Sequence, residues 1–213
     1  MRPGFVVGLT AEARIAAQGG YLARAGGGLP AGAAQAALEL LDDGADGLIS
    51  FGLAGGLDPA LRPGTIIIPA AVLADGARCA ADPTLSRRFG VTTPHLLLAG
   101  SAVVSGKAEK AALHHATGAH AVDLESGAVA QVAAQRGVPF AVIRAICDPA
   151  ERTLPPAALV ALDAKGGVGP LRVLASVLRQ PSQIPDLLRL ARDAAAARAA
   201  LVRVVARASA AES

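Results

Sequence analysis

AHAVDLESGAVAQVAAQRGVPFAVIRAICDPA, residues Ala119–Ala150, is the stretch that decides the fold. It opens with a short apolar run, Ala119–Val122, of the size of a buried strand. The next run, Ser126–Gln135, has the Ala and Val positions of a helix that packs on a sheet, and a glycine and a proline end that helix. A second β-branched run, Phe140–Ile146, predicts another strand. The order strand, helix, strand is typical of an α/β fold.

Two acids stand at the ends of these predicted elements. Glu125 comes where the first strand turns into the helix, and Asp148 comes just after the second strand. Ligands of α/β sheets bind at the carboxyl ends of the strands, so both acids are candidates for a ligand site. The alternatives are ordinary structural roles: a first-turn helix acid for Glu125, and a turn or N-cap residue before Pro149 for Asp148.

The composition favours one α/β domain and argues against several other classes. The chain has 213 residues, of which 53% are hydrophobic and 17% charged, which suits a packed core of Ala, Val and Leu rather than disorder. The net charge is +3, but the arginines are scattered and only 2% of the residues are aromatic. We therefore expect no nucleic-acid partner, and we interpret the arginines as solvated surface groups.

The cysteines and the hydropathy pattern exclude further features. Cys79 and Cys147 form no CxxC or Cys/His spacing, so no metal site is expected, and a reduced pair is favoured over a disulfide. We expect no signal peptide, because the first residues lack a long apolar run before a cleavage site. No apolar run reaches membrane-spanning length without charges or turn residues, so no transmembrane segment is expected.

The rest of the chain predicts further strands and helices. Thr10 is a plausible N-cap, with Glu12 in the first turn of its helix, where an acid often serves only to complement the helix dipole. The last helix, expected to start at Pro181–Pro185 and to reach about Ala208, carries an apolar stripe suited to docking on the domain. The expected strands are Phe5–Leu9, Gly47–Phe51, Gly64–Val72 and Leu96–Val104, and the other expected helices are Ala31–Leu41, Thr84–Arg88, Lys107–Thr117, Ala157–Ala164 and Leu171–Leu178.

Glycine runs follow two of these segments. Gly26-Gly27-Gly28 precedes a predicted helix, but neither GK[ST] nor GxGxxG is present, so a P-loop and a dinucleotide site are disfavoured. Gly52–Pro59 follows the predicted strand Gly47–Phe51, and such a loop lets the backbone approach a ligand closely. His114 and His115 are adjacent on a predicted helix with no partner at i+4, and we interpret them as surface residues.

Three stretches together resemble the nucleoside phosphorylase/nucleosidase superfamily. ISFGLAGGL at Ile49–Leu57, followed by PGTIIIP, is similar to its glycine-rich ribose and base loop. AVDLES at Ala121–Ser126 is similar to its V-[DE]-M-E-[SA] motif, and RAICDPA at Arg144–Ala150 to its R-x-[IV]-S-D-x-A motif. Each motif alone is weak, but their order and spacing match over residues 5–150. Within this superfamily the chain is similar to methylthioadenosine/S-adenosylhomocysteine nucleosidases, and it most resembles the branch found with hopanoid biosynthesis, through DPAERTLPPAAL and VLRQPSQIPDLLRLARDAA.

The resemblance implies roles for individual residues. Asp148 matches the general acid that protonates N7 of the leaving adenine, and Glu125 matches the glutamate that binds the ribose hydroxyls. Glu12 matches the glutamate that positions the attacking water. The resemblance also implies a set of substrate-binding residues beside Glu125: Leu53, Ala54, Gly55, Val104, Ser105 and Leu124.

The sequence departs from the family pattern at several of these positions. Ser50 stands where phosphorylases carry an arginine, and Leu53 replaces a serine, so a phosphate site is disfavoured. Arg14 and Arg24 remain as candidate phosphate ligands, which keeps phosphorolysis open. Leu124 replaces the usual methionine with similar apolar bulk. No aromatic residue follows Val104-Ser105-Gly106 to stack on the base, so the choice of adenine rests on the resemblance.

The resemblance implies a single three-layer α/β/α sandwich with a mixed central sheet over residues 1–213. It implies a purine nucleosidase that releases adenine from an adenosyl compound, adenosylhopane being the expected substrate, without a metal or organic cofactor. The expected setting is the cytoplasm, including contact with a membrane surface, and the expected assembly is a homo-oligomer, commonly a dimer. The alternatives are a phosphorylase on the same scaffold, a methylthioadenosine/S-adenosylhomocysteine nucleosidase, and a nucleoside-binding protein without activity.

Overall fold

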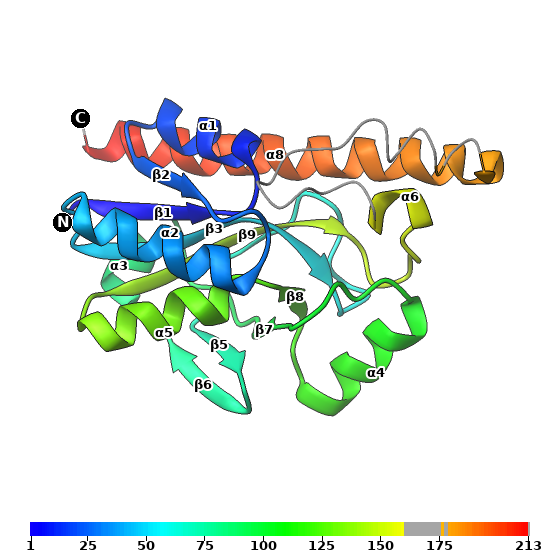
Figure 1. Ribbon diagram of the computed structural model, residues 1–213, viewed down its shortest axis with the longest axis horizontal. Coiled ribbons are helices and arrows are strands. Elements are labelled where there is room, and N and C mark those ends of the chain that lie inside the picture. Colours follow the sequence, from blue (N-terminus) through cyan, green and yellow to red (C-terminus); the bar gives the residue numbers. More distant parts are fainter. Residues whose placement is uncertain (160–175, 177–178, 213) are drawn as a thin grey trace.

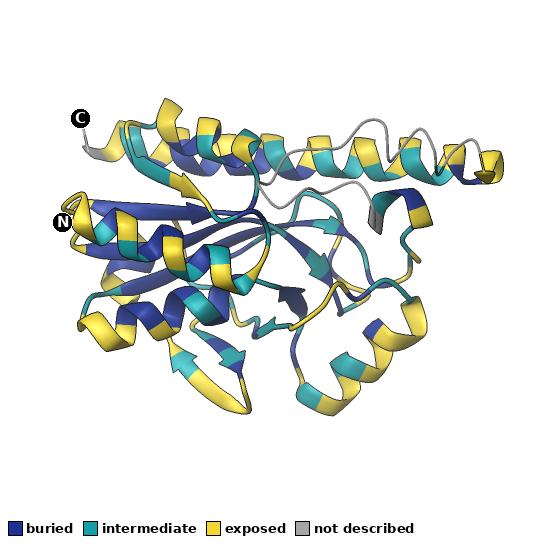
Figure 2. Cartoon of the chain, in the orientation of Figure 1, coloured by how far each residue is buried: buried dark blue, intermediate teal, exposed yellow. Residues whose placement is uncertain are grey.

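The central strands bury both of their faces, and this fixes the layers of the molecule. A computed structural model describes residues 1–159, 176 and 179–212 of the chain. Successive side chains of a strand point to opposite faces of the sheet. In β1 (Pro3–Val7), Phe5 and Val7 join one hydrophobic cluster, while Val6 joins another, and all three are 0% exposed. Figure 2 shows the central strands as the most buried part of the chain.

Helices cover both faces of the sheet. On one face α2 (Pro30–Asp42) and α5 (Ser126–Arg136) pack through small side chains such as Ala37 and Ala133. On the other face α1 (Thr10–Gln18) and α8 (Ile184–Glu212) lie side by side (Figure 1). The remaining described helices are α3 (Pro83–Arg87), α4 (Lys107–Thr117), α6 (Pro156–Leu159) and the 3-10 turn η1 (Pro181–Gln183). The predicted three-layer α/β/α arrangement is confirmed.

The sheet is mixed, as the resemblance implied. Its described strands run in the order β2-β1-β3-β8-β7-β5-β6, and β9 pairs with β3 and β4. β3 is parallel to β1 and β9 but antiparallel to β8. The strands besides β1 are β2 (Leu22–Ala25), β3 (Gly47–Gly56), β4 (Ile66–Ile67), β5 (Ala71–Ala74), β6 (Ala77–Ala80), β7 (Leu97–Ala99), β8 (Ala121–Asp123) and β9 (Phe140–Asp148).

The glycine-rich segment after Phe51 differs from its prediction as a loop. β3 continues through it to Gly56, because β9 provides backbone partners as far as Asp148. The register shifts between Ala54 and Gly55, because β9 carries one extra residue, Cys147, opposite this step. Gly52 has a φ of 152°, a conformation that favours glycine, and it makes this path possible. The backbone still reaches the site, as part of a strand.

Other boundaries were predicted wrongly. The N-cap position of α1 is occupied by Leu9, not Thr10, and the Glu12 side chain accepts a hydrogen bond from the Leu9 amide. The single strand predicted for Gly64–Val72 is divided into β4 and β5, and the one predicted for Leu96–Val104 is reduced to β7. The predicted Leu171–Leu178 helix, and the predicted Ala157–Ala164 helix beyond α6, lie outside the described residues apart from position 176.

Candidate active site

A cavity of about 490 Å³ opens where the central strands end. β3 forms its floor, and the start of α1 and the first half of α8 form one wall. Residues 102–104 and the segment after β9 form the other wall. The cavity contains the side chains of Glu12, Glu125 and Asp148, which lie far apart in the sequence. The topology explains this meeting of the three acids.

β3 is the element that brings the acids together. At its end β9 lies on one side and stops at Asp148, opposite Gly55. On the other side β8 runs antiparallel to β3, so the chain after it turns back and places Glu125 beside the end of β1. A Cβ atom on Gly8 would lie 2.6 Å from Glu125 Oε1, which shows how closely this carboxylate approaches the backbone.

Glu12 is fixed by backbone amides. Its Oε2 accepts hydrogen bonds from the amides of Gly8 and Leu9, and its Oε1 accepts one from Leu53 at 3.0 Å. The side chain is 2% exposed, and this burial raises its pKa, against the opposing effect of the Arg144 guanidinium. Oε1 keeps acceptor capacity for one further group in the cavity.

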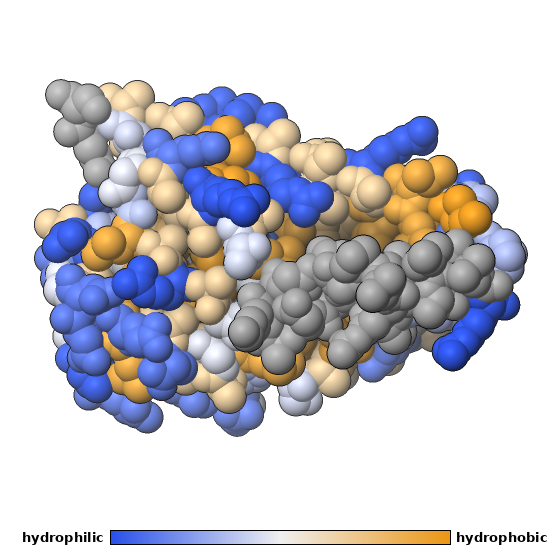
Figure 3. All heavy atoms as spheres, turned by 45° about the horizontal axis from the view of Figure 1, so that its top comes forward, coloured by the Kyte–Doolittle hydropathy of each residue, from blue (hydrophilic) through white to orange (hydrophobic). Residues whose placement is uncertain are grey.

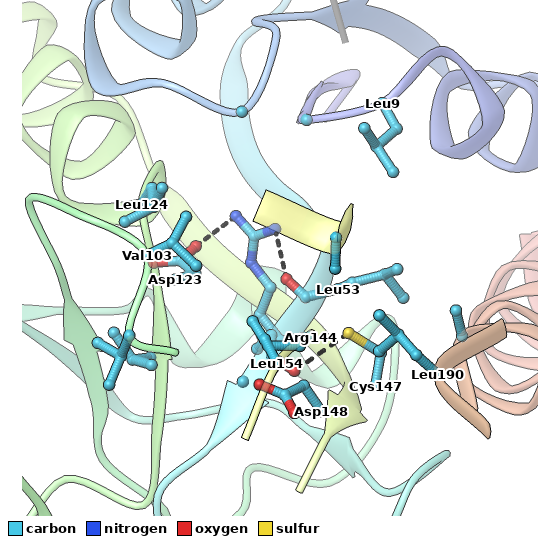
Figure 4. A pocket seen from close by; sticks show the side chains of 18 of the residues that line it. Leu9, Leu53, Val103, Asp123, Leu124, Arg144, Cys147, Asp148, Leu154 and Leu190 are labelled. Carbon is cyan, nitrogen blue, oxygen red and sulfur yellow. Dashed lines mark hydrogen bonds and ion pairs between the residues drawn. The ribbon is translucent and has the colours of Figure 1, made fainter. Parts of the chain in front are cut away.

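Arg144 is a buried cation shared by the acids. Its Nη2 forms an ion pair with Asp123 Oδ2 at 2.5 Å and donates a hydrogen bond to Glu125 Oε2 at 3.0 Å. The same nitrogen donates to Ser50 Oγ at 2.6 Å, and Nη1 donates to the carbonyl of Leu53. Figure 4 shows this guanidinium at the centre of the cavity lining. Ser50 therefore holds Arg144 in place. The sequence predicted neither this contact nor the ion pair between Arg144 and Asp123.

Glu125 keeps one oxygen free for a ligand. Oε2 is paired with Arg144, whereas Oε1 is buried and has no hydrogen-bond partner among the described residues. Burial raises the pKa of Glu125 to about 7; Arg144 opposes the shift, and the neighbouring charges of Asp123 and Glu12 add to it. A buried acceptor without a partner is unfavourable unless a ligand satisfies it.

Asp148 shows the same asymmetry. Its Oδ2 accepts a hydrogen bond from Lys110 Nζ at 2.5 Å, while its Oδ1 is buried and unpartnered in the described part of the chain. Burial raises the pKa of this carboxyl, and the adjacent Lys110 ammonium opposes the rise. The cavity thus holds two carboxyl groups that each offer one unsatisfied oxygen.

Both walls of the cavity carry apolar side chains. The first half of α8 contributes Leu187, Leu190 and Ala194, and Leu154 and Val103 face it from other segments. The predicted stripe therefore divides along α8: Leu201 and Val204 are buried in the core, while the earlier members line the cavity. Figure 3 shows hydrophobic residues gathered at the end of the molecule where α8 begins.

Most residues named from the sequence lie around this cavity. Its lining includes Glu12, Leu53, Ala54, Gly55, Val104, Leu124, Glu125 and Asp148. Ser105 is not part of the lining; its carbonyl accepts a hydrogen bond from the amide of Leu154. The roles in binding and chemistry that the sequence analysis gave to all these residues stay predictions.

Lys110 and the α8 residues were missed for different reasons. Lys107–Thr117 has the composition of a surface helix, so nothing marked Lys110 as buried. Arg144 did offer a signal, because a charged residue inside the apolar run Phe140–Ile146 requires buried partners. The apolar stripe of α8 was interpreted mainly as a docking surface, so none of its residues was assigned to the site.

Three further features of the described residues bear on the expectations for a metal site, for His114 and for membranes. They contain no group of three or more His, Cys, Asp or Glu side chains arranged to hold a metal ion. His114, predicted to be a surface residue, is half-buried, and its Nδ1 lies 2.7 Å from the carbonyl of Ala119. Among the helices in the described ranges, none combines the length and apolar character needed to cross a membrane.

Solved structures share this fold. A 5′-methylthioadenosine/S-adenosylhomocysteine nucleosidase from Neisseria meningitidis, in complex with methylthio-immucillin-A, is 19% identical, with a TM-score of 0.67 over 97% of this chain and 99% of that one. A nucleosidase of the same kind from Colwellia psychrerythraea, in complex with adenine, is 16% identical, with a TM-score of 0.68 over 97% and 95% of the two chains. Futalosine hydrolase of Helicobacter pylori is 16% identical, with a TM-score of 0.64 over 84% and 97%.

The sequence itself also matches a known family. The profile of the phosphorylase superfamily matches residues 7–97 and 96–167. The matched residues begin at the last residue of β1, continue past β9 and include all three acids of the cavity. The chain belongs to the phosphorylase superfamily.

Proposed function

We propose that this protein is a purine nucleosidase that hydrolyses the N-glycosidic bond of an adenosyl compound and releases adenine. One observation carries the proposal: Glu125 and Asp148 each present to the same cavity a buried oxygen that has no partner in the described part of the chain, and Glu12 lies beside them. A nucleoside can satisfy these atoms, with its ribose hydroxyls on Glu125 and N7 of its base on Asp148.

The proposed reaction divides the work between the acids. Asp148 donates its proton to N7, the bond between C1′ and N9 breaks, and its electron pair goes to the base. The carboxylate of Glu125 stabilises the positive charge that develops on the sugar. Glu12 holds a water molecule through Oε1 and takes its proton as the oxygen bonds to C1′. The products are adenine and the free sugar.

Hydrolysis is favoured over phosphorolysis by the charges around the cavity. Arg144 is already paired with Asp123 and Glu125, so it is not a free phosphate ligand. Arg14 is exposed, Arg24 is paired with Asp43, and neither belongs to the cavity lining. Arg198 does belong to that lining, and it is the observation that favours a phosphorylase as the second candidate.

The apolar wall supports a hydrophobic group on the 5′ carbon. We propose adenosylhopane as the substrate, because the α8 side chains Leu187, Leu190 and Ala194 provide apolar contacts beyond the sugar site. Such a lipid would bring the protein to a membrane surface from the cytoplasm. Methylthioadenosine and S-adenosylhomocysteine, with smaller 5′ groups, are the alternatives.

Product analysis tests the proposal. Purified protein should release adenine from an adenosyl-lipid, methylthioadenosine, S-adenosylhomocysteine or adenosine, with free sugar as the second product in the absence of phosphate. A strict requirement for phosphate would establish the phosphorylase instead. Binding of an adenosine ligand without release of adenine from any substrate would establish an inactive binding protein.

A further inference from the structure

Lys110 is placed in an unusual way for a lysine. It lies in the first turns of α4 and is 0% exposed, and it is the only residue of that helix that is buried. Lysine is rarely buried completely, and a positive charge near a helix N-terminus is unfavourable. An arrangement with these two costs needs a compensating contact.

The contacts of the ammonium group supply that compensation. Nζ donates to Asp148 Oδ2 at 2.5 Å, to the carbonyl of Arg152 at 2.9 Å and to the carbonyl of Pro149 at 3.1 Å. An ammonium group has three protons and no acceptor, so all its hydrogen bonds are made. Lys110 thereby holds the Asp148 carboxyl and the chain that follows it.

This geometry makes the two oxygens of Asp148 unequal. Oδ2 faces a permanent donor and can only accept, so a proton on this carboxyl must reside on Oδ1. Oδ1 is the oxygen that has no partner among the described residues. We propose that Lys110 is a positioning residue for the reaction: it directs the acidic proton to Oδ1 and stabilises the carboxylate that remains after transfer to the base. This inference rests on the proposed role of Asp148 as general acid.

The other ionisable groups near Asp148 are either paired with each other or neutral near pH 7. Arg152, in the segment after β9, forms an ion pair with Asp193 of α8. The neighbouring Cys147 thiol is neutral near pH 7, because burial and the Asp148 charge raise its pKa to about 12. Lys110 is therefore the cation in direct contact with the Asp148 carboxyl. Because Lys110 opposes the effect of burial, its removal should raise the pKa of Asp148 further.

The test compares two leaving groups. In Lys110→Met, adenine release should fall about 100-fold in kcat with little change in KM, since a positioned acid is typically worth 10²–10⁴-fold. The basic limb of its pH profile should move to higher pH. A substrate with the same sugar and a p-nitrophenyl leaving group needs no protonation, so its cleavage should change less than about 5-fold. Lys110→Arg should recover part of the adenine release, and Lys107→Met, at an exposed position of the same helix, is the matched control.

Equal losses on both substrates, or an unshifted pH limb, would show that Lys110 only supports the structure and would overturn the inference. Unchanged adenine release would overturn it as well. Should Lys110→Met not fold, Lys110→Arg decides by the same comparison: a loss confined to adenine supports the inference, and an equal loss refutes it. Wild-type protein that releases no adenine refutes the proposed function instead, which keeps the two failures distinct.

Discussion

At the scale of single residues, the site depends on carboxyl groups that folding forces into burial. Glu12, Glu125 and Asp148 are each less than 10% exposed, and burial raises the pKa of all three. One guanidinium and one ammonium group, on Arg144 and Lys110, compensate for this burial. Replacement of a single acid should therefore change chemistry and stability in ways that can be separated.

Asp148→Asn tests the acid. The amide keeps the size of the side chain but cannot protonate N7, so kcat for adenine release should fall by about 10²–10⁴-fold. Steady-state assays of released adenine measure the effect, and thermal unfolding checks that the variant is folded. Full activity in this variant would rule out Asp148 as the acid.

Glu125→Gln tests the pKa of the acid that we propose binds the ribose. Because the folded-state pKa of about 7 exceeds the ordinary value of 4.5, the group stabilises the fold below about pH 4.5, and this stabilisation is lost as the pH rises through 7. Glutamine does not titrate. The free energy of unfolding of the variant, relative to wild type, should thus rise by roughly 3 kcal/mol between pH 4.5 and 8.

Urea unfolding at several pH values measures this difference. A constant difference across the range would mean that Glu125 has the same pKa in the folded and unfolded chain.

At the scale of elements, the proposed function assigns catalysis to the end of β3 and the choice of substrate to α8. β3 brings the acids together at its end, and α8 covers the cavity with apolar side chains. The first function depends on close backbone packing and the second on side-chain size. Each can be tested by one substitution.

Gly8→Ala should disturb the acids without a large change of fold. A Cβ atom there would lie 2.6 Å from Glu125 Oε1, so the carboxylate must move. We expect kcat/KM for adenine release to fall at least about 10-fold, since small displacements of catalytic groups are costly. Gly106→Ala is the control, because its Cβ meets nothing within 4 Å. Equal activities of the two variants would contradict this packing.

Leu190→Gln should weaken binding of substrates with an apolar 5′ group. Leu190 lines the cavity, and the lost apolar contact of about 1–2 kcal/mol corresponds to a rise in KM of roughly 5- to 30-fold. Leu188→Gln is the matched control, because Leu188 is 56% exposed and outside the lining. A rise in KM of the same size in both variants would contradict a role of this wall in substrate choice.

At the scale of the whole molecule, the fold followed from the sequence more completely than the site did. Apolar β-branched runs and well-marked helix ends, as in α5 with Gly137 after it, predict the elements, and the family resemblance implied their layers. The continuation of β3 through Gly55 depends on pairing with β9, which is distant in the chain, so local sequence predicted a loop. Lys110 and Leu190 joined the site only through tertiary packing, and their local patterns gave no indication of it.

The expected homo-oligomer stays a prediction. Light scattering coupled to size-exclusion chromatography should give about twice the mass of one chain at micromolar concentration, as for a dimer. A mass equal to one chain would contradict this expectation and leave the proposed reaction unaffected.

The most direct measurement is the release of adenine from an adenosyl substrate in phosphate-free buffer by wild type and Asp148→Asn. If the three acids form one hydrolytic site, wild type should release adenine and free sugar in equal amounts, and the variant should be at least about 100-fold slower. Adenine release at the same rate by both proteins, or only when phosphate is added, would contradict the proposed hydrolytic mechanism.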